Sequence, residues 1–510
     1  MDRAIAAPDD PRGLSGLATT VDAAAEAITT LRLEEAERVL ASVKGREAEQ
    51  PAVLFQLARL HYYRGDYASA VGAAERAMER ATDRQRERFS QMLELMRASE
   101  RIGATYEQMV SDDGRFVVLH QKGKDAMLAV HAIEVLARAD TALEKVFGTR
   151  MPGPIRLEIY PGAETLAEVS TLTLEQIQTT GTIALSKWNR LMLTSPKALV
   201  RGYPWADTVT HELIHMVLSR MTLEHAPVWL QEGTAKLFER AWRGGEVGKL
   251  DLDPGAQALL VDAHKSGELL TFEQMHPSIA MLPSEDDAAL AFAQVATFME
   301  RYVQDHGLAK LRDALQRIAS GRDARAALAA AAGVSFAQLE RGWKSGLPAD
   351  DGVKLKRLKR RFRVGDGPHD ESEEVEESQA RRYMRIGDLL WDRGRIAAAA
   401  KEYRKAHGAD PLDPIVAARF GRAALQSGDP QGAVDALARQ AELYPGHGPT
   451  HAVLGVAQAE LGNRDAAQVS LREAVWTNPF DPAPHCALAK VGATRREIDR
   501  ALEACALLSP

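Results

Sequence analysis

The strongest constraint on the fold is a 34-residue repeat in the C-terminal part of this 510-residue chain. Small residues and prolines recur at this interval in four sets: Gly387, Gly421 and Gly455; Gly394, Gly428 and Gly462; Ala399, Ala433 and Ala467; and Pro411, Pro445 and Pro479. Small residues allow two helices to pack closely, glycine permits the turn between them, and proline ends the unit. Residues 379–510 are therefore predicted to form stacked pairs of helices.

This register resembles the tetratricopeptide repeat, whose unit is a pair of helices joined by a turn. The resemblance implies an all-α region whose concave surface recruits a substrate or a protein partner; the alternative is a rigid spacer or a dimer surface. Gln440 stands where the neighbouring repeats have Ala406 and Ala474, so the middle repeat is imperfect. Residues after about 485 are expected to form one or two capping helices.

A weaker pattern with the same spacing lies near the N-terminus. Ala24 and Ala58 are 34 residues apart, as are Ala36 and Ala70, although Leu31 replaces the glycine expected in the first unit. Residues 1–105 are therefore predicted to be helical, with two degenerate tetratricopeptide-like helix pairs over about 18–100. The alternative is a pair of plain helical hairpins that brace the next domain.

The middle of the chain contains a motif with metal-binding chemistry, His211-Glu212-Leu213-Ile214-His215. The surrounding run from Asp207 to Leu218 has the pattern of a helix, and residues four apart on a helix share a face. Both imidazoles can therefore bind one ion, while Glu212 can act as general base on a metal-bound water. The alternative is a chance occurrence of the motif on an ordinary buried helix.

A catalytic zinc site usually needs a third protein ligand. Position 221 is a methionine, which excludes the metzincin arrangement with its third histidine. Glu232 lies 17 residues after His215, on a second predicted helix that begins near Pro227. Glu232 is thus the predicted ligand, in competition with Glu224, His225 and Glu239. Glu239, two turns further along the same face, is the weaker candidate for a residue that supports a ligand.

The two segments, His211–His215 and Pro227-Val-Trp-Leu-Gln-Glu-Gly-Thr-Ala235, resemble the gluzincin branch of zinc metallopeptidases, specifically the bacterial peptidase-MA-like domains. The resemblance extends over about 106–347 and implies an α+β zincin-like domain, predicted at 106–350, between the two helical regions. It implies Zn²⁺ as cofactor, His211, His215 and Glu232 as zinc ligands, and Glu212 as general base. Hydrolysis of peptide bonds in a peptide or protein substrate is the expected activity.

One position departs from this family. Relatives commonly carry a tyrosine where this chain has Phe292, just before a predicted helix at Val295–Tyr302, and phenylalanine cannot donate a hydrogen bond to the oxyanion. Tyr203, His225 or Tyr302 could substitute. The departure favours altered activity over a dead site, because the metal itself still polarises the substrate carbonyl.

The substrate side of the site is less determined. Thr182–Leu193 has the alternation of an edge strand, which could hold an extended peptide; the alternative is an ordinary last strand of the sheet. The chain lacks the Gly-x-Met-Glu-Asn run with which aminopeptidases of this clan hold the substrate amine, which favours an endopeptidase. The competing hypothesis is a non-catalytic repeat scaffold with a vestigial zincin domain.

Composition limits the other possibilities. Residues 351–378 form a linker in which a basic run (Lys354–Arg363) precedes an acidic one (Asp366–Glu377), and the net charge of −7 argues against nucleic-acid binding. Cys486 and Cys505 are the only cysteines, so neither a disulfide framework nor a cysteine zinc site is expected. Neither a signal peptide nor a membrane span is predicted, so the expected location is cytoplasmic unless the start is misassigned.

Overall fold

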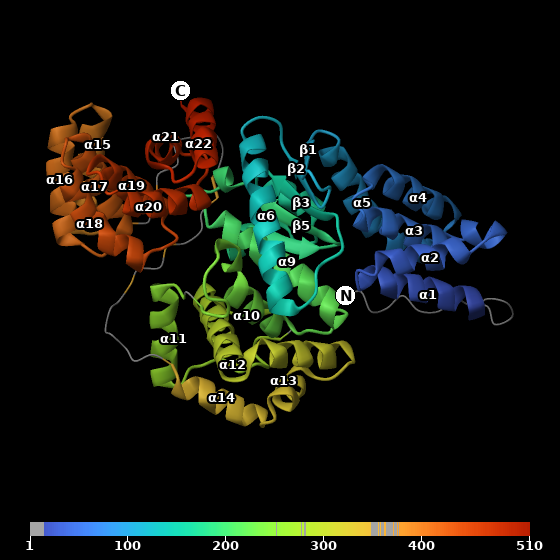
Figure 1. The fold of residues 1–510 in the computed structure, drawn as a ribbon. Coiled ribbons are helices and arrows are strands. Elements are labelled where there is room, and N and C mark those ends of the chain that lie inside the picture. Colours follow the sequence, from blue (N-terminus) through green and yellow to red (C-terminus); the bar gives the residue numbers. More distant parts are fainter. Residues whose placement is uncertain are drawn as a thin grey trace.

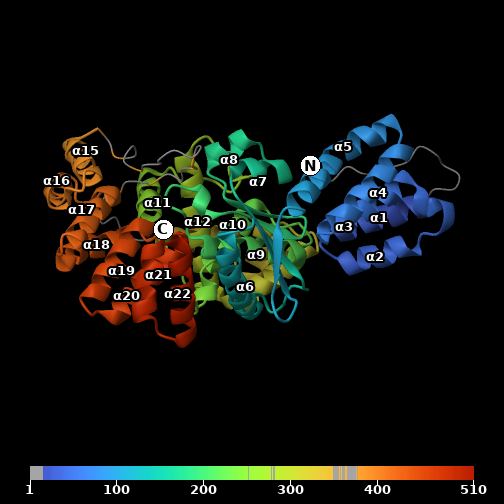
Figure 2. The same ribbon diagram turned by 90° about the horizontal axis from the view of Figure 1, so that it is seen from above.

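The computed structural model describes residues 15–250, 252–276, 278–279, 282–347, 355, 358, 362–363, 371, 375 and 377–509. Most of these residues are helical, with one small mixed sheet in the middle of the chain. The N-terminal and C-terminal helices lie on opposite sides of the part that contains the sheet (Figures 1 and 2). The expected order of a helical region, an α+β region and tetratricopeptide-like helices is thus present. The charged linker falls largely outside the described residues.

The N-terminal helices form two antiparallel pairs followed by a long helix. Their bounds are α1 (Ser15–Thr29), α2 (Leu33–Ser42), α3 (Pro51–Tyr63), α4 (Tyr67–Arg80) and α5 (Asp83–Gly103), with a short 3₁₀ turn η1 (Gly45–Glu49). The four alanines spaced by 34 residues are fully buried between these helices. Gly65 has a left-handed backbone in the second inter-helix turn, and Leu31 adopts the same conformation in the first, with φ of 75° and 58°. Leu31 therefore forms the same turn as the glycine, although its side chain makes this backbone conformation unfavourable.

The sheet has five strands in the order β1-β2-β3-β5-β4. β2, β3 and β5 are parallel, while β1 and β4 are antiparallel edge strands. The strands are β1 (Glu107–Val110), β2 (Phe116–His120), β3 (Ile155–Tyr160), β4 (Ala184–Lys187) and β5 (Arg190–Thr194). The central strands are buried except at Arg156 of β3, which is partly exposed, as expected for parallel strands covered on both faces.

The prediction of a single edge strand over Thr182–Leu193 is wrong. This segment is a hairpin, β4 and β5, and only β4 lies at the edge. Trp188 and Asn189 form its two-residue turn, with φ of 55° and 59°. Positive φ at both positions matches the twist of the strands, but tryptophan gives no sequence signal for such a turn.

The helices of the central part pack around the sheet and around one another (Figure 1). α6 and α9 contact the sheet and each other, and α10 lies between α9 and α12. α12 is interrupted at Gly307, whose φ is 78°. The helices are α6 (Asp125–Phe147), α7 (Ala163–Val169), α8 (Leu174–Thr180), α9 (Trp205–Thr222), α10 (Val228–Phe238), α11 (Pro254–Ser266), α12 (Glu285–Ala319), α13 (Ala324–Ala332) and α14 (Phe336–Ser345), with 3₁₀ turns η2 (Pro196–Ala198) and η3 (Ala241–Arg243).

The C-terminal part consists of four helix pairs. They are α15 (Gln379–Asp392) with α16 (Ile396–Ala409), α17 (Pro414–Gln426) with α18 (Pro430–Leu443), α19 (Gly448–Glu460) with α20 (Arg464–Thr477), and α21 (Pro482–Val491) with α22 (Arg495–Leu508). A Cβ atom added to Gly421 would lie 2.5 Å from Leu437, so this glycine allows the two helices to touch. Gln440 is buried, and its amide donates a hydrogen bond to the carbonyl of Pro411 over 2.6 Å. The imperfect repeat thus gives the amide nitrogen of its polar side chain a partner in the turn before α17.

The sequence predicts no disulfide framework, and a single disulfide is nevertheless present among the described residues. Cys486 on α21 and Cys505 on α22 are joined, with Cα atoms 4.9 Å apart. Their separation of 19 residues gave no reason to pair them, whereas the antiparallel packing of the last two helices brings them together. Among the described residues, no helix is both long and apolar enough to cross a membrane.

A buried ion pair joins the N-terminal helices to the sheet. Glu158 on β3 accepts hydrogen bonds from Tyr67 of α4, from Tyr160 and from Arg156, and Arg190 of β5 lies 3.3 Å away. Arg190 in turn donates a hydrogen bond to Tyr62 of α3 over 2.7 Å. Burial alone would raise the pKa of Glu158, but Arg190 and Arg156 lower this pKa to about 2. Breaking one side of such a pair leaves an uncompensated buried charge.

We expect Glu158→Gln to reduce the free energy of unfolding by about 3–5 kcal/mol at neutral pH, because Arg190 loses its buried partner. The contribution of Glu158 is complete above the unfolded-state pKa near 4.5 and is lost as the pH falls toward about 2. The difference between the two proteins in urea unfolding should therefore shrink over that interval. Glu168→Gln, which breaks an exposed pair with Arg101, is the control and should change stability by less than about 1 kcal/mol. Equal effects of the two substitutions would contradict this account.

Candidate metal centre

The predicted metal-binding residues lie on two packed helices. α9 contains His211, Glu212 and His215, and α10 begins after Pro227 and contains Glu232. Glu224 and His225 lie in the connection, as predicted, and a left-handed residue at Leu223 (φ 50°) ends α9. The connection is short, so α10 folds back along α9 and turns Glu232 toward the two histidines.

Three candidate ligand atoms converge. The Nε2 atoms of His211 and His215 lie 3.2 Å and 3.5 Å from one carboxylate oxygen of Glu232. The ligand atoms of the three residues all lie within 4.8 Å of one another. Nitrogen and oxygen ligands bound tetrahedrally at about 2.1 Å are about 3.4 Å apart, so these separations fit such an ion. The three side chains are between 14% and 20% exposed, so an ion can reach them from solvent.

The three groups form a hydrogen-bonded ionic cluster. Burial opposes the charge on His211, but hydrogen bonds to Glu232 and Glu239 raise the pKa of His211 to about 10. Burial likewise opposes the charge on Glu232, but His215 and His211 hold the pKa of Glu232 well below its usual range. Two imidazoles and a carboxylate thus concentrate around one point, and a divalent cation bound there would replace the histidine protons.

Glu239 occupies the position expected of a supporting residue. Its carboxylate lies 3.0 Å from Nδ1 of His211, and Lys236 donates a hydrogen bond to its other oxygen over 2.7 Å. Because the Nδ1 side of His211 is held by Glu239, Nε2 is the ring nitrogen that faces Glu232 and His215 and is available to a metal ion. Glu239 is the C-cap residue of α10, and its position relative to Glu232 is set by that helix.

Glu212 follows His211 on α9 and is buried. Burial raises the pKa of Glu212 above its ordinary value. The backbone N–H of Ser186, on the edge strand β4, lies near its carboxylate and partly offsets this rise by lowering the pKa of Glu212. The candidate base is thus held against the edge strand, beside the point where the two histidines and Glu232 meet.

A glycine lets α10 approach α12. A Cβ atom added to Gly233, next to Glu232, would lie 2.6 Å from the carbonyl oxygen of Val295 in α12. Phe292 is in α12 one helical turn before Val295, inside the helix rather than ahead of it as predicted. It is partly buried against the main hydrophobic core. The close contact at Gly233 thus sets the position of Glu232 relative to α12.

Two of the three residues considered as substitutes for the missing tyrosine use their hydroxyl groups in hydrogen bonds to the backbone. The hydroxyl of Tyr302 donates a hydrogen bond to the carbonyl of Leu328 over 3.2 Å, and that of Tyr203 donates one to the carbonyl of Thr194. His225 lines a cavity of about 730 Å³ beside the N-terminus of α10. The hydroxyl groups of Tyr203 and Tyr302 are therefore both used in hydrogen bonds to backbone carbonyls.

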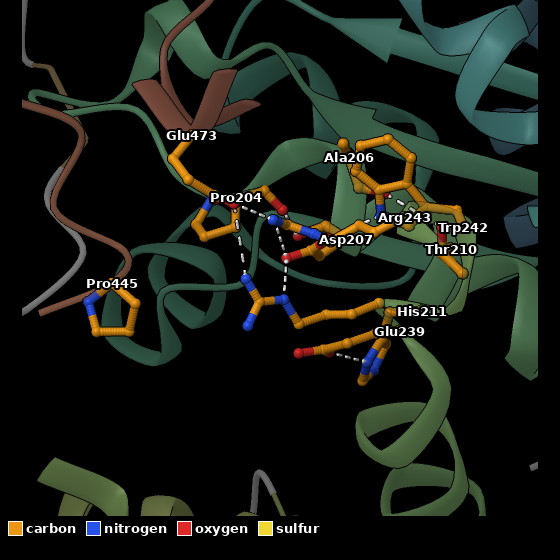
Figure 3. A network of polar contacts seen from close by, with 12 residues as sticks. Pro204, Ala206, Asp207, Thr210, His211, Glu239, Trp242, Arg243, Pro445 and Glu473 are labelled. Atoms are coloured by element: carbon orange, nitrogen blue, oxygen red, sulfur yellow. Dashed lines mark hydrogen bonds and ion pairs between the residues drawn. The ribbon is translucent and has the colours of Figure 1, made fainter. Parts of the chain in front are cut away.

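The sequence did not indicate the network around Asp207, which precedes His211 by one helical turn. Asp207 accepts hydrogen bonds from Trp242 Nε1 over 2.8 Å, and from Arg243 Nε and Nη2 over 2.8 Å and 2.7 Å (Figure 3). Because Glu239 holds His211 and Arg243 holds Asp207, the segment from Glu239 to Arg243 contacts two successive turns of α9. In the sequence, only the four-residue spacing between Asp207 and His211 indicates that Asp207 lies on the same face of α9 as the predicted ligand.

Comparison with models of protein families places a Peptidase MA superfamily domain at residues 136–349 and a tetratricopeptide repeat at residues 380–411. The first range includes all the residues that converge at the candidate metal centre. The chain therefore combines a Peptidase MA superfamily domain with a repeat of a class that supports protein interaction.

Other comparisons add little. A comparison with curated proteins gave no match. Among solved structures, a crystal structure of MamA is 25% identical and covers 24% of this chain and 72% of its own, with a TM-score of 0.21. The crystal structure of the APC/C hetero-tetramer Cut9-Hcn1 is 14% identical and covers 98% of this chain and 94% of its own, with a TM-score of 0.24. These TM-scores are too low to support an argument.

We expect Gly233→Ala to reduce the free energy of unfolding by about 1–3 kcal/mol, because the added methyl group meets a backbone carbonyl that cannot move aside cheaply. Gly342→Ala in α14 is the matched control, since nothing lies within 4 Å of its added Cβ. The control should stabilise the protein by about 0.5–1 kcal/mol through helix propensity. Chemical denaturation of both variants measures the contrast, and equal effects would show that Gly233 is not a close-packing residue.

Proposed function

We propose that the protein is a zinc-dependent endopeptidase whose repeats recruit its substrate or a protein partner. The observation that supports this most is the convergence of His211, His215 and Glu232, with ligand atoms within 4.8 Å of one another inside a Peptidase MA superfamily domain. Two imidazoles and one carboxylate match the ligand preference of zinc, and three protein ligands leave a position for water. The donor set thus fits the metal that the family commonly uses.

The residues of the chain divide the reaction between them. A bound zinc ion would polarise the scissile carbonyl and lower the pKa of its water. Glu212 would accept a proton from the water whose oxygen attacks the carbonyl carbon. It would then pass this proton to the amine nitrogen as the carbon–nitrogen bond breaks. Glu239 keeps His211 in the tautomer whose Nε2 binds metal.

The edge strand β4 supports the endopeptidase assignment. The backbone N–H of Ser186 points to Glu212, so it lies on the side of β4 that faces away from β5. An extended peptide beside this side of β4 would pass Glu212 in the middle of its length rather than at its end. Such a binding mode does not require an anchor for the substrate amine.

A second candidate function is favoured by Phe292. A domain that binds metal or peptide without turnover would not need a hydrogen-bond donor to the oxyanion, and losing one such donor typically costs about 3–4 kcal/mol of transition-state stabilisation. In that case the repeats would be the functional part of the chain. Turnover distinguishes the two candidates, whereas metal content does not.

The proposal predicts about one zinc ion per chain in protein purified without chelator, and none in His215→Ala. Glu212→Gln should keep the metal, because its side chain is not a ligand, but lose at least about a hundredfold of the cleavage of an internally quenched peptide library. Elemental analysis and the cleavage assay on the three proteins check this. Zinc in the wild type without cleavage that depends on Glu212 would favour the non-catalytic alternative. A lack of zinc after reconstitution would exclude both zinc functions.

Glu239→Gln should weaken zinc binding by about 10–100-fold, because Nδ1 of His211 loses its carboxylate partner. Competition with a chromophoric chelator measures the dissociation constant. The control is Glu246→Gln, an exposed residue seven positions further along the chain, which should leave the affinity unchanged. An unchanged affinity in Glu239→Gln would remove this residue from the metal centre.

A further inference from the structure

The third C-terminal helix pair docks on the start of α9, the helix that bears the two histidines. The indole N–H of Trp205, the first residue of α9, donates a hydrogen bond to the carbonyl of Val475 over 3.1 Å. The backbone N–H of Tyr203 donates one to the carbonyl of Thr477 over 2.9 Å. Both acceptors lie at the C-terminal end of α20, so the repeats hold the backbone of Tyr203 and the side chain of Trp205 at the start of the helix that bears the two histidines.

The docking leaves no space for a side chain at Gly202. The backbone of Gly202 has φ of 70°, and a Cβ atom there would lie 2.3 Å from the carbonyl oxygen of Thr477. Aromatic side chains also pack between α20 and the segment that follows α10. The rings of Trp242 and Trp476 meet edge to face with centroids 4.9 Å apart, and the guanidinium of Arg243 lies 4.7 Å from the centroid of Trp476. These contacts resemble a packed interior more than a transient surface.

A charged residue of the repeats enters the network that supports the metal centre. Glu473 of α20 accepts a hydrogen bond from Nη1 of Arg243, whose other two nitrogens bind Asp207, and Arg240 lies 3.9 Å from the same glutamate oxygen (Figure 3). Arg240 follows Glu239, the residue that holds His211, and lies 3.6 Å from Asp207. Arg243 and Glu473 are 12% and 19% exposed, so solvent screens their interaction little.

We propose that Glu473 is a positioning residue for the metal centre, so that the C-terminal repeats form part of its support. Glu473 fixes the guanidinium of Arg243, which fixes Asp207 and thereby the first turns of α9. Through Arg240 it also restrains the end of α10 from which Glu239 reaches His211. Displacement of α20 by a protein bound to the repeats would then loosen both supports of His211. The inference rests on the proposed zinc function only for its effect on metal affinity.

The test uses the full chain with Glu473→Gln, which keeps the size of the side chain and removes its charge. Glu460→Gln, an exposed glutamate at the end of the neighbouring helix α19, is the control. Gly202→Ala is a second variant that disturbs the same contact without changing any charge. Thermal unfolding in the presence of chelator first confirms that each variant is folded.

Two measurements then decide the matter. Amide hydrogen exchange in a peptide covering residues 203–211, measured without metal, should be faster in Glu473→Gln and Gly202→Ala than in the wild type and the control. The zinc dissociation constant should rise by about tenfold in both variants, and kcat should fall with little change in KM.

Each outcome of these measurements has a distinct meaning. Unchanged exchange in both variants would overturn the proposal, and so would faster exchange with unchanged zinc affinity, because the contact would then be structural only. If the wild type binds no zinc, the proposed function fails while the exchange experiment still decides whether the repeats support α9.

Discussion

The arrangement of the central part depends on the ion pair between Asp207 and Arg243. Both side chains are largely removed from water, which is expensive for two charges unless their geometry and remaining hydrogen bonds are good. Arg243 binds both oxygens of Asp207, and Trp242 donates a further hydrogen bond to the same carboxylate. The carboxylate also lies in the first turn of α9, where the helix dipole favours a negative charge. One interaction thus places the start of α9, the segment after α10 and helix α20 relative to one another.

A comparable device fixes the other side of the domain. Glu158 and Arg190 are the buried charges of β3 and β5, and tyrosines of α3 and α4 bind both of them. Both networks contain buried charges, which would destabilise the fold if they lacked hydrogen-bond partners. Some of these partners come from the flanking helices, α3 and α4 in one network and α20 in the other. The specificity of docking therefore comes from charge satisfaction as well as from apolar contact. The helices at both ends of the chain are built into the fold of the central part.

Features that follow from the spacing of residues along the chain could be predicted from the sequence. The 34-residue register identified the helix pairs, and two histidines four apart identified the face of α9. Glu232 was preferred over Glu224 because a helix beginning near Pro227 turns the former inward, which is where the structure places it. Glu473 is 230 residues from Arg243, and no pattern connects them before the chain is folded. The pairing of Cys486 with Cys505 and the turn at Trp188 were not predicted for the same reason, since packing rather than local preference determines them.

The combination of Phe292 with docked repeats bears on the kind of substrate that the proposed peptidase would use. A site without the phenol must obtain its transition-state stabilisation from fewer contacts at the reacting carbonyl. Binding energy from remote parts of a substrate can compensate, provided that the remote site is held rigidly relative to the reacting bond. The contacts of Val475 and Thr477 with the start of α9 supply that rigidity, because they fix the repeats against the helix that bears His211. A protein held by the repeats would therefore be a better substrate for such a site than a short peptide with the same cleavage sequence.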